Sequence, residues 1–323
     1  MTSREHVRKG LQTVDGRGLN GQNGPLQMMK IYVKLILTTL FWGGTFVAGK
    51  LAAQNVGPFS IAFLRFAIAS AFLLPLTWCR EGKFPRPKRS QILPVILLGL
   101  IGIALYNVMF YKGLKIIEAS RATLIIATCP IFITVFSAAF LKEKITSLKA
   151  LGIAVSVCGA AVVISKGDMS SIISGGLGRG ELYIFCCVLS WATYSLIGKG
   201  VMKELSPLTA VSYSAVVGAI ALSVPACIEG LTGYVAHQSA RDWLCICYLG
   251  VFGTVVGFVW YYQGVARLGP TRAGLFINFV PIFGILCARV ILKEQITLSL
   301  AFGAFMVISG VYLTNRNPKF GRG

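Results

Sequence analysis

Residues 281–297 read PIFGILCARVILKEQIT, and residues 130–146 read PIFITVFSAAFLKEKIT. The two stretches share a Pro-Ile-Phe start and a Leu-Lys-Glu-x-Ile-Thr ending, and they lie 151 positions apart. This offset holds without a gap from Leu98 to Gly159, where 21 of 62 aligned positions are identical. The identities include arginine, proline, tyrosine and glycine, which two unrelated apolar segments do not share in register. The chain therefore contains an internal duplication.

The composition is that of a membrane protein. The chain has 323 residues, of which 55% are hydrophobic and 13% charged, and its mean hydropathy is +0.73. Soluble domains carry about 25% charged residues, so the bilayer is the natural solvent for this chain. Its net charge of +20 does not indicate a nucleic-acid partner. The basic residues lie in short runs between long apolar segments, where they anchor a protein at the membrane surface.

No metal or cofactor site is expected. Nearly all of the nine cysteines lie in apolar segments and none forms a CxxC pair, so we interpret them as small buried hydrophobic residues. The two histidines, His6 and His237, are far apart in polar stretches and cannot assemble a zinc site.

A helix crosses the hydrocarbon core in about 20 residues, and we predict ten such helices joined by short connections. Their expected spans are 32–53, 58–79, 92–112, 120–141, 148–165, 181–199, 207–228, 242–263, 272–292 and 298–314. The polar residues 1–30 are expected to form a disordered cytoplasmic segment. The first span is not interpreted as a signal peptide, because it exceeds the usual apolar core of one and has a counterpart later in the chain.

The distribution of lysine and arginine predicts the orientation. With the N-terminus in the cytoplasm, the inside segments hold 21 of these residues and the outside segments hold eight. Arg65 and Arg289 lie within predicted helices and complete the total of 31. Basic residues concentrate on the cytoplasmic side of membrane proteins, so both termini are expected in the cytoplasm.

The starts of the two halves also align, at an offset of 149, which pairs Trp42 with Trp191 and Pro58 with Pro207. We therefore predict two five-helix repeats, residues 31–165 and 181–315. Because five is odd, the second repeat enters the membrane from the opposite side. Inverted repeats of this kind are typical of secondary transporters, in which the substrate binds at the repeat interface near the midplane.

Several motifs occur in a recognisable order. WGGTFVAGK lies at 42–50, LRF at 64–66, and P-x(12)-E at 130–143 and again at 281–294, and the fifth and tenth spans are rich in glycine. From about residue 32 to 315 the chain resembles the EamA-type transporters of the drug/metabolite transporter superfamily. The resemblance implies a bacterial inner-membrane exporter of amino acids or related small metabolites. Some members of the superfamily import, and distant ones exchange sugar phosphates or nucleotide sugars.

Polar and aromatic residues within the apolar spans are candidates for a substrate cavity, because a cavity lined by rings and a few amides suits amphipathic solutes. They are Trp42, Thr45, Arg65, Asn107, Tyr111, Trp191, Tyr194, Trp260, Tyr262 and Asn278. A different interpretation places Tyr111 and Tyr262 in an interfacial aromatic belt. Trp42 and Trp191 are equally compatible with packing between helices.

Arg65 is placed about seven residues into the second span. An arginine at the centre of the bilayer costs about 2.5–3.5 kcal/mol on insertion scales. Arg65 must therefore extend to the membrane surface, pair with carbonyl groups, or face the cavity and bind a substrate carboxylate.

Glu143 and Glu294 close the fourth and ninth spans, where a carboxylate opposes the helix dipole. Thr146 and Thr297 follow at positions that can cap the next helix, so each glutamate is expected near the positive end of that next helix. This arrangement describes a structural clamp of the hairpin; a gating or proton-linked role is the other interpretation. No carboxylate is predicted at mid-membrane, which favours a facilitator without proton coupling.

An alternating-access exporter is the function that these features favour. A sugar-phosphate or nucleotide-sugar antiporter, or an importer of the same superfamily, is the alternative. A membrane-embedded enzyme is disfavoured, because the spans hold no Asp/Glu/His pair and no HExxH motif. The expected partners are a small-molecule substrate and the lipid bilayer, and the expected state is a monomer or a homodimer.

Overall fold

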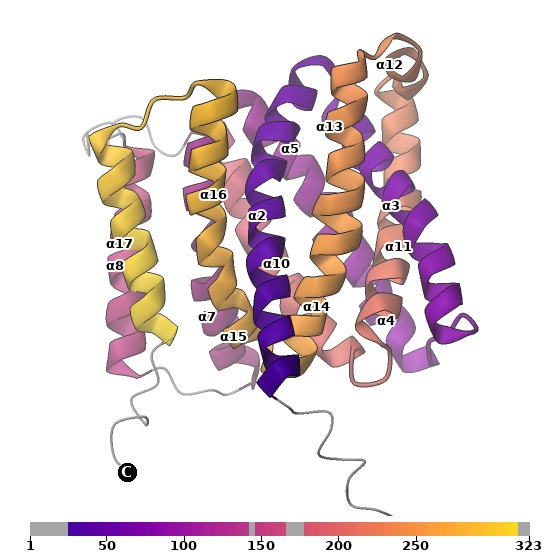
Figure 1. Cartoon of the computed structure of the whole chain (residues 1–323), viewed down its shortest axis with the longest axis horizontal. Coiled ribbons are helices and arrows are strands. Elements are labelled where there is room, and N and C mark those ends of the chain that lie inside the picture. The colour runs from indigo at the N-terminus through magenta and orange to yellow at the C-terminus, as the bar shows by residue number, and fades with distance from the viewer. Residues whose placement is uncertain (1–24, 142–145, 166–177, 316–323) are drawn as a thin grey trace, which may run out of the picture.

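The computed structural model describes residues 25–141, 146–165 and 178–315, and the regular structure within these ranges is helical (Figure 1). Eight helical stretches in the described residues are long and apolar enough to cross a membrane. They are Leu26–Asn55, Pro58–Glu81, Arg89–Ile116, Ala119–Phe140, Arg179–Val201, Pro207–Ile228, Ala240–Leu268 and Arg272–Leu292. Two shorter apolar helices, Ser147–Val163 and Leu298–Leu313, accompany them. The prediction of an all-helical membrane protein is confirmed.

Several of these stretches are built from more than one helical segment. The continuous helices are α2 (Pro25–Asn55), α3 (Pro58–Glu81), α8 (Ser147–Ile164), α10 (Arg179–Val201), α11 (Pro207–Ile228), α12 (Leu231–His237) and α17 (Leu298–Asn315). The composite ones are α4 (Arg89–Leu97), η2 (Leu98–Leu105) and α5 (Tyr106–Ile116); α6 (Ala119–Ile126) and α7 (Cys129–Leu141); α13 (Ala240–Gly250), η3 (Val251–Val256) and α14 (Gly257–Leu268); and α15 (Pro270–Gly274), η4 (Leu275–Asn278), α16 (Phe279–Cys287) and η5 (Ala288–Leu292).

The first helix begins earlier than expected. α2 starts at Pro25, so residues 25–30 are helical and not disordered as predicted. Proline is favoured at the first helical position, where its missing N–H costs nothing. Residues 1–24 lie outside the described part of the chain.

Side-chain caps begin four of the helices. The hydroxyls of Thr146, Ser206, Ser239 and Thr297 each accept a hydrogen bond from the backbone N–H three residues later. Such caps satisfy an N–H that has no partner within the helix. The capping roles predicted for Thr146 and Thr297 are confirmed.

Two π-helical segments interrupt the membrane stretches Arg89–Ile116 and Ala240–Leu268 at equivalent places. η2 begins at Leu98 and η3 begins at Val251, two residues after Leu249, the counterpart of Leu98 at the offset of 151. A π-helical turn is wider than an α-helical turn and is frequently found at functional sites. Both segments lie beside the centre of the bundle.

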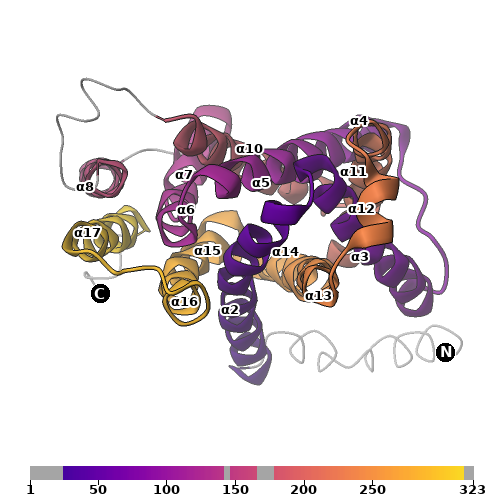
Figure 2. The same cartoon turned by 90° about the horizontal axis from the view of Figure 1, so that it is seen from above.

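The packing of the helices places this centre between the two halves of the chain. α3 packs against α11 and α8 against α17, while α2 contacts α14 and α16, and α10 contacts α5 and α7. Figure 2 shows α8 and α17 at one edge of the molecule and α3, α4 and α11 at the other. The α8–α17 contact is close, since a Cβ atom added at Gly310 would lie 2.4 Å from the Ser156 nitrogen. Small residues allow this approach in membrane helices.

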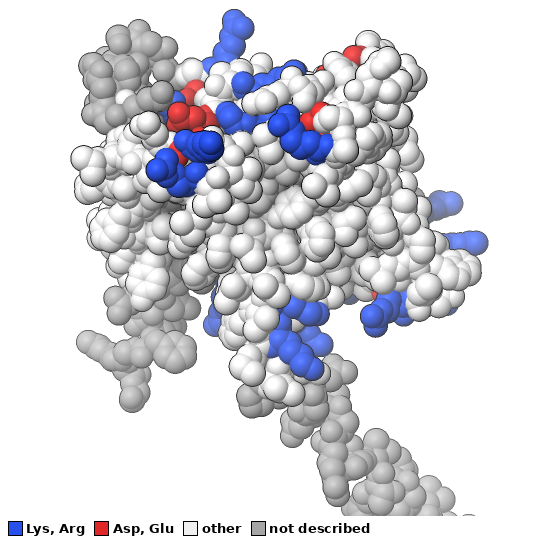
Figure 3. Space-filling view, turned by 45° about the horizontal axis from the view of Figure 1, so that its top comes forward, with Lys and Arg blue, Asp and Glu red and all other residues white. Residues whose placement is uncertain are grey.

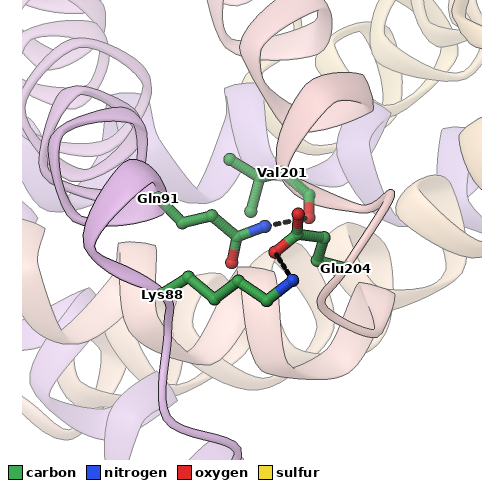
Figure 4. Close-up of polar contacts among 4 residues, drawn as sticks. All are labelled: Lys88, Gln91, Val201 and Glu204. Carbon is green, nitrogen blue, oxygen red and sulfur yellow. Dashed lines mark hydrogen bonds and ion pairs between the residues drawn. The ribbon is translucent and has the colours of Figure 1, made fainter.

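Charged side chains gather at the two ends of the bundle and leave a largely uncharged band between them (Figure 3). At the lower end in Figure 1, where α2 begins, Lys88 forms a 3.2 Å ion pair with Glu204, and the Gln91 amide donates to the Val201 carbonyl (Figure 4). These contacts hold the start of α4 against the end of α10. This distribution of charge matches a protein that spans a bilayer.

Candidate functional site

Arg65 lies in the centre of the bundle and does not extend to the membrane surface. Its side chain projects from α3 and the residue is 4% exposed. The guanidinium donates from Nε to Thr254 Oγ1 at 2.8 Å, from Nη1 to Asn107 Oδ1 at 2.9 Å and to the Tyr111 hydroxyl at 3.3 Å, and from Nη2 to the Gly253 carbonyl at 3.3 Å. These acceptors are neutral, and no carboxylate in the described ranges forms an ion pair with it. Arg65 is therefore a buried cation without a counter-ion in the described structure.

The π-helical segments position the acceptors around Arg65. Asn107 is the second residue of α5, directly after η2, and its amide nitrogen donates to the Ile103 carbonyl within η2, which turns Oδ1 toward the guanidinium. On the opposite side, Gly253 and Thr254 lie within η3, and the Gly253 carbonyl accepts from the side chains of Trp42 and Arg65. The guanidinium thus links the two halves of the chain.

Aromatic rings surround a cavity next to Arg65. Its walls come from α2, α3, α5, α6, α10, α14 and the η4–α16 region, and the lining residues are Trp42, Thr45, Phe46, Arg65, Tyr106, Phe110, Ile126, Trp191, Phe258, Ile277 and Val280. Trp42 and Trp191 meet edge to face with ring centroids 5.2 Å apart. The Arg65 guanidinium also lies 5.9 Å from the centre of the Phe258 ring, a favourable cation–π distance.

The two equivalent tryptophans differ in their hydrogen bonds. The Trp42 indole N–H donates to the Gly253 carbonyl at 3.0 Å. The Trp191 indole N–H, although buried at the cavity, has no well-aligned acceptor among the described residues. A buried donor without a partner is costly, so a ligand oxygen in the cavity would satisfy it.

The cavity is small in this structure. Its volume is about 30 Å³, enough for a water molecule or two, whereas ligand sites usually measure about 300–1,000 Å³. The cavity, as it stands in this structure, is therefore too small to hold a metabolite.

Four other predicted site residues do not line the cavity: Tyr111, Tyr194, Trp260 and Tyr262. Tyr111 and Tyr262 are fully buried, so the interpretation as an interfacial belt is wrong for both. Tyr194 and Tyr262 stack with ring centroids 5.1 Å apart, and the Tyr262 hydroxyl donates a hydrogen bond to the Tyr194 backbone carbonyl. Neither residue lines the cavity, so this pair lies behind its wall. Trp260 lies away from the cavity, where its ring contacts Lys34.

Asn278 ends η4 beside two lining residues. Its side-chain oxygen is buried without a hydrogen-bond partner in the described part of the chain. Sequence reasoning did not single out Thr254, Tyr106, Phe110 or Phe258, which complete the site. Both Tyr106 and Phe258 carried a signal in the sequence, since Tyr106 lies next to Asn107 and Phe258 is the counterpart of Asn107 at the offset of 151.

The connection between η5 and α17 lies at the upper end of the bundle in Figure 1, and the Glu294 carboxylate in this connection lies against the start of α6. It accepts from the backbone N–H groups of Ala119 and Ser120 and from the Ser120 hydroxyl. The hydrogen bonds of the Glu294 carboxylate thus go to the start of α6, and none in the described structure goes to the start of α17, the helix that follows it. Glu143 lies outside the described residues.

A helical membrane bundle with a closed, ring-lined cavity and one buried guanidinium at its centre has the build of a small-molecule transporter. The chain belongs to the EamA-like transporter family, whose profile matches residues 29–165 and 178–316. The resemblance seen in the sequence is therefore confirmed. The family and the relatives are transporters, so this protein is a transporter and not an enzyme.

Three curated relatives show the extent of the similarity. The chain is 28% identical over 298 residues to the uncharacterized transporter YyaM of Bacillus subtilis (strain 168), covering 91% of this chain and 97% of the relative. It is 31% identical over 290 residues to an uncharacterized transporter of Archaeoglobus fulgidus, covering 89% and 99%. It is 26% identical over 294 residues to a probable terminal-alkyne amino-acid exporter of Streptantibioticus cattleyicolor, covering 90% and 95%. A solved crystal structure superposes with a TM-score of 0.62 at 18% identity, over 88% of this chain and 97% of that one, and shares the fold.

Proposed function

We propose that the protein is an alternating-access carrier that exports amino acids or related small metabolites across the inner membrane of the cell. The observation that carries this proposal is the buried Arg65 guanidinium, which faces the cavity and is held by neutral acceptors alone. A substrate carboxylate supplies the missing negative charge, and charge-assisted hydrogen bonds of this kind are strong. The name of the relative from Streptantibioticus cattleyicolor, a probable amino-acid exporter, agrees with this substrate class.

The proposed substrate contacts follow from the cavity walls. Arg65 and the free Trp191 N–H donate to the carboxylate, while Trp42 and Thr45 border the rest of the substrate. The remaining predicted residues act from behind the wall or join the site as it opens, and they are Asn107, Tyr111, Tyr194, Trp260, Tyr262 and Asn278. Of these, Asn107 and Tyr111 position the guanidinium.

The architecture proposed for this carrier is ten membrane-spanning helices in two inverted five-helix repeats, residues 31–165 and 181–315. The family profile matches the chain in two segments with similar limits, 29–165 and 178–316. The contact between α2 and α16 has its counterpart in the contact between α10 and α7, and α3–α11 and α8–α17 pair equivalent helices. α8 and α17 have 18 residues each, which at 1.5 Å per residue gives about 27 Å, close to the hydrocarbon thickness.

Two equivalent lysines at opposite ends of the bundle make different contacts, which supports alternation between two openings. At the upper end, Lys50 donates to the carbonyls of Leu114 and Ile117, and Arg121 pairs with Glu181 at 3.0 Å. Lys199, the counterpart of Lys50 at the lower end, is exposed and makes no hydrogen bond within the described ranges. We propose that the upper end faces the outside and is closed here, with both termini in the cytoplasm.

The alternative functions, an antiporter of sugar phosphates or nucleotide sugars and an importer, are supported less well. A phosphorylated substrate calls for several cationic groups in the cavity, and Arg65 is the one cation among its described lining residues. Lys50 and Lys199 lie at the ends of the bundle. The described carboxylates that form contacts also lie at the ends, which supports a facilitator without proton coupling.

The experiment that tests the proposed function compares metabolites in the medium of cells that overproduce the protein with those of cells that produce the Arg65→Gln variant at the same membrane level. We expect one or a few amino acids, or related carboxylates with an apolar part, to accumulate only with the wild-type protein. Identical media from the two cultures would refute the proposal.

A further inference from the structure

A second hollow lies at the lower end of the bundle in Figure 1, between the start of α2 and the end of α14. Its volume is about 500 Å³, far more than that of the central cavity, and it shares no lining residue with that cavity. We call it the lower groove, and its polar lining residues are Gln27, Lys30, Lys34, Gln263 and Arg267. The lower groove has room for a small metabolite.

The lower groove and the central cavity lie along the same face of α2. Gln27, Ile31 and Lys34 line the groove, and Trp42 and Thr45 line the cavity. Together with position 38, these residues follow one another at intervals of three or four, the spacing of neighbours on one helix face. Lys34 and Trp42 are eight residues apart, or about 12 Å along the helix axis. The groove therefore lies in line with the cavity, nearer the lower end of the bundle.

Two buried residues of α2 lie between the groove and the cavity on this face. Leu35 packs against α14, where a Cβ atom added at Gly264 would lie 2.7 Å from the Leu35 side chain. The Thr38 hydroxyl is buried without a hydrogen-bond partner in the described part of the chain. A solute that moves from the groove to the cavity has to pass the contact between α2 and α14 at this level.

The groove carries three positive charges and no negative one on its described walls. Lys34 donates to the Gln263 side-chain oxygen at 2.8 Å, and its ammonium lies 5.9 Å from the centre of the Trp260 ring. The other two cations, Lys30 and Arg267, are exposed and form no ion pair within the described ranges. Figure 3 shows blue side chains without red ones around this end of α2. The groove therefore attracts a carboxylate and repels an ammonium group.

We propose that the lower groove is the loading site of the transporter, where carboxylate metabolites of net negative charge bind before they pass to Arg65. The proposal rests on the proposed export function, with the lower end in the cytoplasm. The carboxylate binds among Lys30, Lys34 and Arg267, and Arg65, the cation of the central cavity, receives it next. A cleft lined by charges of one sign raises the local concentration of ions of the other sign and their rate of association.

The same charges select among carboxylates. The described lining residues of the groove and of the cavity include no aspartate or glutamate. The ammonium group of a zwitterionic amino acid therefore meets no counter-ion among them, and in the groove it faces three cations. A carboxylate metabolite without an ammonium group has no such cost, so the groove favours it over the zwitterion.

The test compares the uptake of radiolabelled N-acetylleucine and leucine into inside-out membrane vesicles, in which the lower end faces the medium. The two probes share the carboxylate and the apolar part, and N-acetylleucine lacks the ammonium group. Well below saturation, we expect wild-type vesicles to take up N-acetylleucine about tenfold faster than leucine. Added salt should lower this rate, because it screens exposed charges.

The groove variant is Lys30→Gln/Arg267→Gln, which removes the two exposed cations and keeps Lys34 with its contacts to Gln263 and Trp260. It should take up N-acetylleucine about tenfold more slowly than wild type at low concentration, and with little response to salt. At saturation its rate should lie within about twofold of wild type, because the central cavity is unchanged. The matched control, Lys115→Gln/Arg241→Gln, removes two charges from the upper end and should keep the wild-type rate at both concentrations.

Four results would overturn the proposal. Equal slowing in both double variants would mean that only net charge matters. Slowing of the groove variant by the same factor at low and at saturating concentration would mean that the groove does not load substrate. Equal uptake of the two probes by wild-type vesicles would contradict the selection for net negative charge, and this comparison decides even if the groove variant does not fold. Uptake of neither probe would refute the loading site, while the comparison of media with Arg65→Gln would still decide the proposed function.

Discussion

The Glu294 carboxylate accepts hydrogen bonds from both the backbone N–H and the hydroxyl of Ser120, at 3.0 and 2.6 Å. The two residues are 174 positions apart in the sequence. The contact joins the connection after η5 to the first turn of α6, where the positive end of the helix dipole favours a negative charge. A residue at the end of one half of the chain thereby caps a helix in the other.

This contact predicts that Glu294→Gln destabilises the protein. The amide loses the charge that the helix start favours and replaces one acceptor oxygen by a donor, so we expect a loss of about 1–2 kcal/mol. Thermal unfolding in detergent micelles measures the effect. The control is Glu118→Gln, because Glu118 is exposed and its side chain makes no capping bond. Equal melting temperatures for both variants would contradict the capping role.

Substitution of the two cavity tryptophans should affect stability and transport differently. Trp42→Phe removes the hydrogen bond to the Gly253 carbonyl and should cost about 1 kcal/mol more than Trp191→Phe. Trp191→Phe removes the same ring area and, within the described residues, no well-aligned protein hydrogen bond, yet it should reduce transport by about tenfold or more, because the Trp191 N–H is proposed to bind the substrate. Melting curves and initial export rates at matched membrane levels give the comparison. A Trp191→Phe variant that transports at the wild-type rate would exclude this donor.

The support given to Arg65 predicts the effect of changing Asn107. Asn107→Leu removes an acceptor from a buried cation and should destabilise the protein by about 1–3 kcal/mol while lowering transport. Ser70→Ala, on the same helix as Arg65, is the control, since the buried Ser70 hydroxyl has no partner in the described structure. It should change stability by less than about 0.5 kcal/mol. Unfolding by heat, combined with the export assay, checks both variants.

The close contact of α8 with α17 predicts opposite outcomes for two glycine substitutions. A Cβ atom at Gly310 would lie 2.4 Å from the Ser156 nitrogen and 2.5 Å from the Gly152 oxygen, so Gly310→Ala must push the helices apart at a cost of about 1–3 kcal/mol. Gly200→Ala meets no atom within 4 Å and should stabilise α10 by up to about 1 kcal/mol. The midpoints of thermal unfolding distinguish them. A neutral Gly310→Ala variant would show that the two helices pack less closely than described.

The sequence was sufficient for the helices and their family, because the signals are local. The span predicted at 207–228 coincides with α11, and Pro58 starts both the predicted second span and α3. Arg65 stood out because a charge inside an apolar span has a large cost. The threonine caps were also readable, since a cap and its N–H partner are three residues apart.

The arrangement of the site was harder to predict, because membrane helices are apolar on all sides. The stripe that marks the buried face of a helix in a soluble protein is missing, so Trp42 in the cavity and Trp260 outside it look alike in sequence. The π-helical segments carry no residue signal of their own, yet they present Gly253 and Thr254 to Arg65. The Glu294 contact joins residues that only the folded chain brings together.

The most direct test of Arg65 as the substrate anchor is uptake of the exported metabolite into proteoliposomes. Wild-type protein should take up the labelled metabolite faster than empty liposomes without an imposed proton gradient. Arg65→Lys keeps the charge but loses the planar set of donors, so it should lower the initial rate by about tenfold or more, and Arg65→Gln should abolish uptake. Arg65→Gln protein that is folded and takes up the metabolite at the wild-type rate would contradict the central claim.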